Sequence, residues 1–134
     1  MALKIDELFG VREDLAAKLR AAGLTDSDKL LAATTTPQQR AELASKLGVD
    51  SKDVLELANR ADLARIKGVG KVYSDLLEWS GVDTVAELAQ RNPENLLAKI
   101  NEMAVEHFVQ RLPTQANVTD WVNQAKALPR VLQY

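Results

Sequence analysis

The chain of 134 residues contains no cysteine and only one histidine, His107. The missing thiols exclude disulfide bonds, thiolate nucleophiles and cysteine-ligated zinc, and a lone histidine is a poor basis for any other metal site. Aromatic residues are also scarce, at 2 Trp, 2 Tyr and 2 Phe. Because base-stacking platforms need clustered aromatic rings, we do not expect a single-strand binder of that kind.

Long hydrophobic runs and an excess of positive charge are both missing as well. The apolar runs span only a few residues, far short of the roughly 20 that a transmembrane helix needs, and Met1–Glu7 has no apolar signal segment. We therefore expect no membrane contact and a cytoplasmic location. The formal net charge of −2 argues against a protein that coats DNA through bulk charge, but it is compatible with a local phosphate site.

Catalytic motifs are missing too. The sequence has no Gly-x-Ser-x-Gly elbow, no phosphate-binding loop of the Walker type and no His-Glu-x-x-His. The stretch Ile66–Gly70 is not a dinucleotide fingerprint, because no strand is predicted before it and the third glycine is absent. The sequence predicts no enzyme, no cofactor and no metal site.

What the sequence does contain is helical periodicity along nearly its whole length. Apolar residues recur every three or four positions, and no segment alternates as a strand would. The pattern predicts an all-α fold, a compact bundle of short helices. We expect a long helix from Pro93 that includes Phe108, a loop over Leu112–Asn117, and a last helix capped by Thr119 that ends before Pro129.

Five predicted helices stop at a glycine that an apolar residue follows. Glycine adopts the left-handed conformation at low cost, and the apolar residue after it packs back on the helix. N-caps are then expected at Thr25 or Asp26, Asp50 or Ser51, and Asp83 or Thr84. The chain thus consists of helix–corner–helix units, with corners at Gly10-Val11, Gly23-Leu24, Gly48-Val49, Gly68-Val69 and Gly81-Val82.

These units also repeat within the chain. Gly10 and Gly68 lie 58 positions apart, as do Gly23 and Gly81, and the apolar residues around them coincide, which predicts an internal duplication. We expect a single domain over 1–134, subdivided into a degenerate first hairpin repeat (5–44), a connecting helical hairpin (45–62), a second hairpin repeat (63–97) and C-terminal helices (98–128).

The turn at 65–71 is the candidate functional site. Two glycines around one apolar residue allow a tight turn whose amides face outward, and these amides together with a helix N-terminus can hold a phosphate oxygen. The predicted phosphate-binding residues are Arg65, Lys67, Gly68, Val69, Gly70 and Lys71. The alternative is a helix corner without a ligand, flanked by solvated cations.

The stretch Ile66–Ser74, with apolar-x-Gly-apolar-Gly and then a small residue, resembles the helix-hairpin-helix signature. The wider chain, over about residues 5–128, resembles an uncharacterised family built from such hairpins, domain of unknown function four-three-three-two. The phrases that carry this resemblance are Ala61–Gly70, Gly81–Ala89, Arg91–Pro93 and Trp121–Lys126.

The helix-hairpin-helix resemblance implies sequence-independent DNA binding, in which paired turns straddle the minor groove. Only Gly68, Val69, Gly70 and Lys71 map onto the phosphate-binding turn. In the first copy Arg12 replaces the second glycine, and the carboxylates that follow at positions 13 and 14 would repel a phosphate.

Two functions follow as hypotheses. The first is a non-enzymatic module that contacts a nucleic-acid phosphate backbone. The second is a protein–protein interaction or scaffold module within a larger assembly, with no nucleic-acid binding. Leu132 and Tyr134, near the end of the chain, are expected either to be loose or to dock on a partner, and the oligomeric state is left open.

Overall fold

The computed structural model describes residues 3–8 and 13–134. Within these residues the protein is all-helical, and its only β-type contact is an isolated bridge between Lys4 and Asp26. A short 3-10 helix, η1 (Ile5–Glu7), precedes eight α-helices: α1 (Glu13–Ala21), α2 (Ser27–Ala32), α3 (Pro37–Leu47), α4 (Ser51–Leu63), α5 (Lys71–Trp79), α6 (Val85–Ala89), α7 (Pro93–Glu106) and α8 (Gln115–Ala127).

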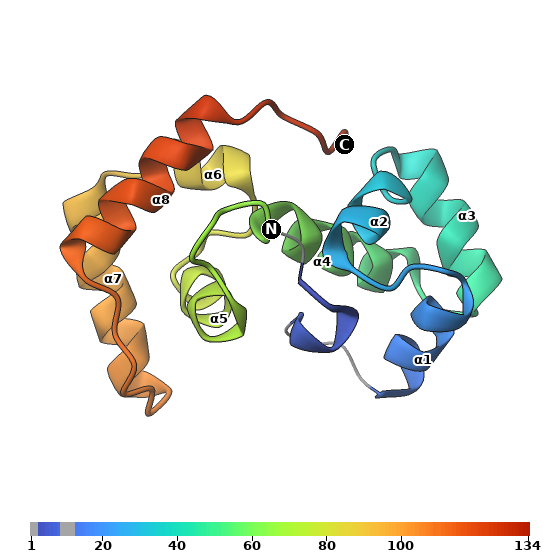
Figure 1. Cartoon of the computed structure of the whole chain (residues 1–134), viewed down its shortest axis with the longest axis horizontal. Helices are drawn as coiled ribbons and strands as arrows, with labels where there is room; N and C mark the ends of the chain where they lie inside the picture. The colour runs from blue at the N-terminus through green and yellow to red at the C-terminus, as the bar shows by residue number, and fades with distance from the viewer. Residues whose placement is uncertain (1–2, 9–12) are drawn as a thin grey trace.

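The helices form two packed groups that share α4. In Figure 1, α1–α3 lie on one side of α4, and α5–α8 lie on the other. The first core consists of buried side chains from residues 5–64 together with Leu132. The second core consists of buried side chains from residues 63–125, with Trp121 at 2% exposure. The helix α4 therefore contributes to both cores, its last turn to the second.

The predicted glycine corners are present wherever the structure describes them. Gly23, Gly48, Gly68 and Gly81 have φ of 83°, 70°, 95° and 89°, the left-handed conformation that glycine favours. After Gly81, the backbone N–H of Val82 donates to the carbonyl of Leu77 at 2.9 Å, and the Val82 side chain is fully buried. The corner predicted at Gly10 lies outside the described residues.

Helix starts follow the predicted capping residues, with one error. Asp26 and Thr84 cap α2 and α6 through their side chains, and Pro37 occupies the first turn of α3. The prediction that Thr119 caps the last helix is wrong. Thr114 does so, because its side chain and that of Asn117 form a reciprocal capping box. The predicted loop over 112–117 therefore ends three residues earlier.

The prediction that Phe108 serves the long helix from Pro93 is also wrong. The helix α7 ends at Glu106, and Phe108 has a φ of 57° and is 91% exposed. The N–H of Val109 donates to the carbonyl of Ala104 at 2.8 Å, and this bond closes the helix end. The half-buried Val109, one residue later, packs on the second core instead.

Helix positions can be compared across the 58-residue offset between the glycines. The bounds of α5 lie 58 positions after those of α1. Leu19 and Leu77 are both fully buried, as are Leu30 and Leu88. Among the described residues, no helix is long and apolar enough to cross a membrane.

Candidate nucleic-acid interface

The turn between α4 and α5, residues 65–71, carries the predicted phosphate site. Gly68 is exposed with a φ of 95°, which reverses the chain, and the buried side chain of Val69 anchors it in the second core. Gly70 is extended, with φ of −96° and ψ of −158°, and is the N-cap of α5. The sequence therefore makes the expected turn, with one residue pointing inward and two glycines around it.

Helix α8 supports this turn from behind. The carboxamide of Gln124 accepts a hydrogen bond from the N–H of Lys67 at 2.8 Å and donates one to the carbonyl of Lys67 at 3.0 Å. A side chain at Gly68 would place its Cβ 3.2 Å from Nε1 of Trp121, so only glycine fits there without a shift. Sequence reasoning missed Gln124 because it lies 57 positions away, and no local pattern links it to the turn.

Two of the three predicted cationic side chains are exposed at the turn. Lys67 and Lys71 are both exposed. Arg65, in contrast, is half-buried and donates to Oδ1 of Asp62 at 2.9 Å and to the carbonyl of Pro129 at 2.7 Å. Its guanidinium is therefore used inside the fold, and the candidate phosphate contacts reduce to two lysines and the backbone.

The N-terminus of α5 offers hydrogen-bond donors beside these lysines. Its N-cap, Gly70, provides no side-chain acceptor, and within the described residues the amides of Gly70, Lys71 and Val72 donate no hydrogen bond. Lys71 itself is poorly placed for helix stability, because the positive end of the helix dipole repels a cation. An anion bound at this end would offset that repulsion.

A buried charged cluster joins α4 to α5 behind the turn. Arg60, 3% exposed, donates to Oγ of Ser74 at 3.1 Å, lies 3.8 Å from Oδ1 of Asp75 and pairs with Glu78. Burial raises the pKa of Asp75, against the opposing effect of the positive charges of Lys71 and Arg60. Burial also lowers the pKa of Arg60, and the charge of Asp75 partly offsets this. The cluster thus fixes the direction of α5 relative to α4.

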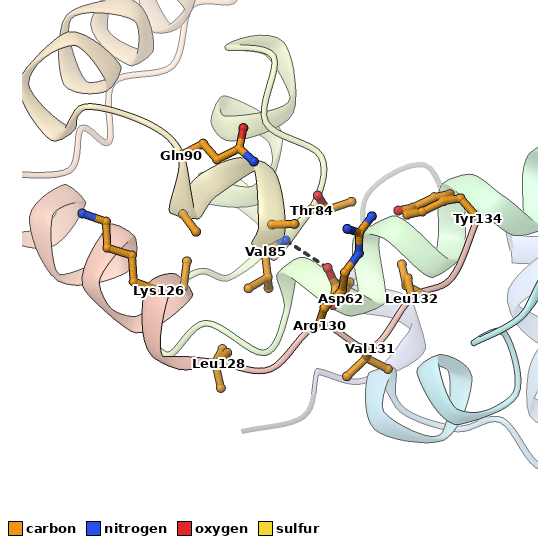
Figure 2. A pocket seen from close by; sticks show the side chains of 13 residues that line it. Asp62, Thr84, Val85, Gln90, Lys126, Leu128, Arg130, Val131, Leu132 and Tyr134 are labelled. Carbon is orange, nitrogen blue, oxygen red and sulfur yellow. Dashed lines mark hydrogen bonds between the residues drawn. The ribbon is translucent and has the colours of Figure 1, made fainter.

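A hollow lies where α6, α8 and the C-terminal tail (residues 129–134) meet (Figure 2). Its volume is about 260 Å³. Asp62 is the only acid among the described residues that line it, and both its oxygens are engaged, one by Arg65 and one by the N–H of Val85 at 2.9 Å. The lining mixes aliphatic side chains with Lys126, Arg130 and Tyr134, and its one acid already pairs within the fold.

The C-terminal tail forms one wall of that hollow and docks on its own chain. Leu132 is 3% exposed and belongs to the first core. The N–H of Gln133 donates to the carbonyl of Thr35 at 2.9 Å, and the hydroxyl of Tyr134 donates to Oδ1 of Asn59 at 2.8 Å. Figure 2 shows Arg130 extending toward Thr84 and the ring of Tyr134. The tail is therefore packed on its own chain and not loose, and its docking on a partner stays a prediction.

The single histidine is occupied by a ring contact. His107 stacks on Trp79, with ring centroids 3.7 Å apart and planes 3° apart. Across residues 3–8 and 13–134, no three His, Asp or Glu side chains are grouped so that they could hold a metal ion.

Comparison with models of protein families finds a match over residues 9–128 to the family described as "Domain of unknown function (DUF4332)". The matched range includes the α4–α5 turn, its support on α8 and both glycine corners of the second half. Searches of curated proteins and of solved structures each returned no match.

Proposed function

The chain belongs to the DUF4332 family, whose description names no activity, and we propose that it is a non-enzymatic helix-hairpin-helix module that contacts the phosphate backbone of a nucleic acid. The observation that carries this proposal is the N-terminus of α5. Its amides at Gly70, Lys71 and Val72 donate to nothing in the described chain, and exposed Lys67 and Lys71 flank them. Such donors next to cations suit a phosphate oxygen.

Binding of this kind would be independent of sequence and weak. Phosphate contacts position a protein on nucleic acid but read no base. Because Lys67 and Lys71 are the exposed lysines of the turn, a plot of the logarithm of the binding constant against the logarithm of the salt concentration should have a slope of about −2. The net charge of −2 adds no long-range attraction, so the contact depends on the local turn.

The internal duplication belongs to the same proposal. We propose that the two halves are tandem helix-hairpin-helix units, which the 58-residue offset between α1 and α5 and the left-handed Gly23 and Gly81 support. The equivalent turn of the first unit, at Gly10–Arg12, lies outside the described residues. Its arginine and the acidic start of α1 favour a single phosphate contact over a paired one.

A test uses fluorescence anisotropy of a labelled short duplex and a labelled single strand, at low and moderate salt, with wild type and with Gly70→Asp/Lys71→Glu. Gly70 has ordinary dihedral angles, and no atom lies within 4 Å of a Cβ built there, so the variant should fold. Its aspartate would cap α5 and occupy the anion position. We expect salt-sensitive binding by wild type and at least a tenfold loss in the variant.

The matched control is Lys52→Glu. Lys52 is likewise an exposed lysine in the first turn of a helix, α4, and this control changes the net charge while leaving the α4–α5 turn intact. It should retain most of the binding. No binding by wild type at low salt, or an equal loss in the control, would reject the proposal.

The alternative, a protein-interaction module, is favoured by one observation. Val105 and Phe108, at 77% and 91% exposure, lie close together at the end of α7. An exposed apolar group of this kind often marks a contact with another protein.

A further inference from the structure

The corner between α7 and α8 presents an apolar knob to solvent. Val105, Phe108 and Leu112 are 77%, 91% and 49% exposed, although all three are large hydrophobic residues. They lie within eight positions of one another in the sequence, from the last turn of α7 to the loop before α8. Large exposed aromatic and aliphatic side chains on one corner of a fold are typical of contact sites.

The backbone at Phe108 is in a conformation that its side chain disfavours. Its φ is 57°, and among the described residues it is the only non-glycine with a positive φ. The N–H of Phe108 donates to the carbonyl of Val105 at 3.3 Å, which places it at the position where helices usually end in glycine. The four described corners with a positive φ at glycine show that this chain uses glycine elsewhere. An exposed phenylalanine here thus lowers stability without any packing gain inside the chain.

The corner is nevertheless held in place on α5. His107 stacks on Trp79, and the guanidinium of Arg111 lies 5.2 Å from the ring centroid of Tyr73. These contacts flank Phe108 on both sides in the sequence. The knob is therefore pre-organised, which lowers the entropy that would be lost on binding.

An apolar hollow adjoins the N-cap of α5. It has a volume of about 420 Å³ and is lined by Leu3, Ala64, Ile66, Lys67, Gly68, Val69 and Gly70. Its size falls within the range of pockets that hold small organic groups, so an aromatic ring can enter it. The α4–α5 turn thus has an apolar recess next to its lysines.

The knob cannot reach the hollow of its own chain. The stack of His107 on Trp79, the last residue of α5, places Phe108 near the C-terminal end of α5, whereas the hollow adjoins the N-cap of α5. Nine residues of α-helix span roughly 13 Å, and Figure 1 shows the end of α7 well apart from the α4–α5 turn. The two surfaces can meet only between two copies.

The charges next to the knob and the hollow favour a contact between two copies. Glu106, exposed at the last turn of α7, has no ion-pair partner within the described chain, and Lys67 at the rim of the hollow has none either. The C-terminal end of α7 is negative and the N-terminal end of α5 is positive. We propose that Phe108 of one copy inserts into the Lys67–Gly70 hollow of a second copy, with Glu106 against Lys67.

This contact is head-to-tail, because knob and hollow are different surfaces. Repetition of the contact builds open chains of copies along the direction of α5, unless the rotation between copies closes a ring. With three exposed apolar side chains on the knob, the interface is small, and we expect a dissociation constant of roughly 10 μM to 1 mM.

The first experiment is sedimentation velocity of the full chain between about 10 μM and about 1 mM, the range expected of such an interface. Wild type should show a weight-average mass that rises at least twofold over this range. Phe108→Gly should stay monomeric and unfold at higher urea than wild type, because glycine adopts the left-handed conformation without strain. Phe108→Leu keeps an apolar knob and should still associate.

The second experiment mixes two variants that each lack one surface. Phe108→Gly keeps the hollow, and Lys67→Glu keeps the knob, so an equimolar mixture should form a complex of only two copies, more than either variant forms alone. Glu106→Lys in the Lys67→Glu background should restore association by reversing both charges. A monomeric wild type at about 1 mM, or a mixture that forms no complex while wild type associates, would overturn the proposal; the latter result would indicate pairing of knob with knob.

Failure of this proposal and failure of nucleic-acid binding are separable. Phe108→Gly lies away from the α5 N-terminus and should retain any binding to a labelled duplex. Wild type that associates without nucleic acid but binds no duplex supports the head-to-tail contact alone.

Discussion

The side-chain amide of Gln124 pairs with both backbone groups of Lys67, accepting from the N–H at 2.8 Å and donating to the carbonyl at 3.0 Å. These two hydrogen bonds connect the candidate phosphate turn to α8. They need a side chain with one donor and one acceptor, so a nearly isosteric substitution of Gln124 that removes the donor tests their contribution.

Gln124→Glu should destabilise the protein by about 1 kcal/mol, because a carboxylate cannot donate to the Lys67 carbonyl and would face it with a like partial charge. Hydrogen exchange of the amides at residues 67–70 should speed up in the same variant. Urea unfolding and exchange rates measure the two effects. Gln90→Glu is the control, since Gln90 is exposed and its side chain makes no hydrogen bond within the described chain. Equal stability of both variants would contradict the assigned role of Gln124.

Substitution by alanine should lower the stability of the protein more at Gly48 than at Gly70. No atom lies within 4 Å of a Cβ built at Gly48 or at Gly70, so space does not separate them. Gly48 has a φ of 70°, whereas Gly70 has a φ of −96°. Gly48→Ala should therefore cost about 1 kcal/mol in left-handed backbone strain, and Gly70→Ala should change stability by less than about 0.5 kcal/mol. Urea unfolding of the two variants measures the loss of stability. A larger loss in Gly70→Ala than in Gly48→Ala would contradict the prediction.

The tail should stabilise the first core although it follows the second in sequence. Leu132→Ala removes a side chain that is 3% exposed and packed in the first core, and we expect a loss of about 2 kcal/mol in the free energy of unfolding. Gln133→Ala is the matched control, because the recorded bonds of Gln133 come from its backbone. If both variants unfold at the same urea concentration, the tail does not pack as described.

Asp75 should give the protein a distinctive pH dependence. Burial raises its pKa above the ordinary value of 3.8, so above that pH the unfolded chain releases the proton before the folded chain does. The stability contributed by Asp75 is therefore present below pH 3.8 and is lost as pH rises through the folded-state pKa. The amide in Asp75→Asn has no such titration.

We accordingly expect wild type to lose stability relative to Asp75→Asn as pH increases above about 4. Urea unfolding at a series of pH values measures this difference. Asp53→Asn, at an exposed position on α4, is the control for the loss of one carboxylate. A difference between wild type and Asp75→Asn that does not vary with pH would show that the carboxyl is not desolvated.

The fold was largely predictable because its signals are local. Helical periodicity, capping residues such as Asp26 and Thr84, and glycines that stop helices all act within one turn of chain. The wrong predictions for Thr119 and Phe108 also concern local signals, because in each case two neighbouring residues compete for one role. Thr114 competes for the cap through Asn117, and the helix end at Glu106 depends on whether Val109 or Phe108 packs inward.

The candidate site was predictable only in its backbone. The Gly68-Val69-Gly70 turn was predictable from the sequence, because glycine adopts the left-handed conformation at low cost and the apolar Val69 between the glycines can anchor the turn in the core. Which cations remain exposed does not follow. Arg65 and Lys67 look equivalent in sequence, yet Asp62 and the Pro129 carbonyl engage Arg65.

The sequence by itself determined the all-helical class, the positions of the corners and the 58-residue spacing of the two halves, since each depends on residues within a few positions of one another. Only the tertiary structure decided which partners the chain brings together over long distances: Gln124 behind Lys67, the tail on the first core, and Phe108 outside at one end of α5 with an apolar hollow at the other. Those contacts depend on the packing of α4, α5 and α8, which no local preference specifies.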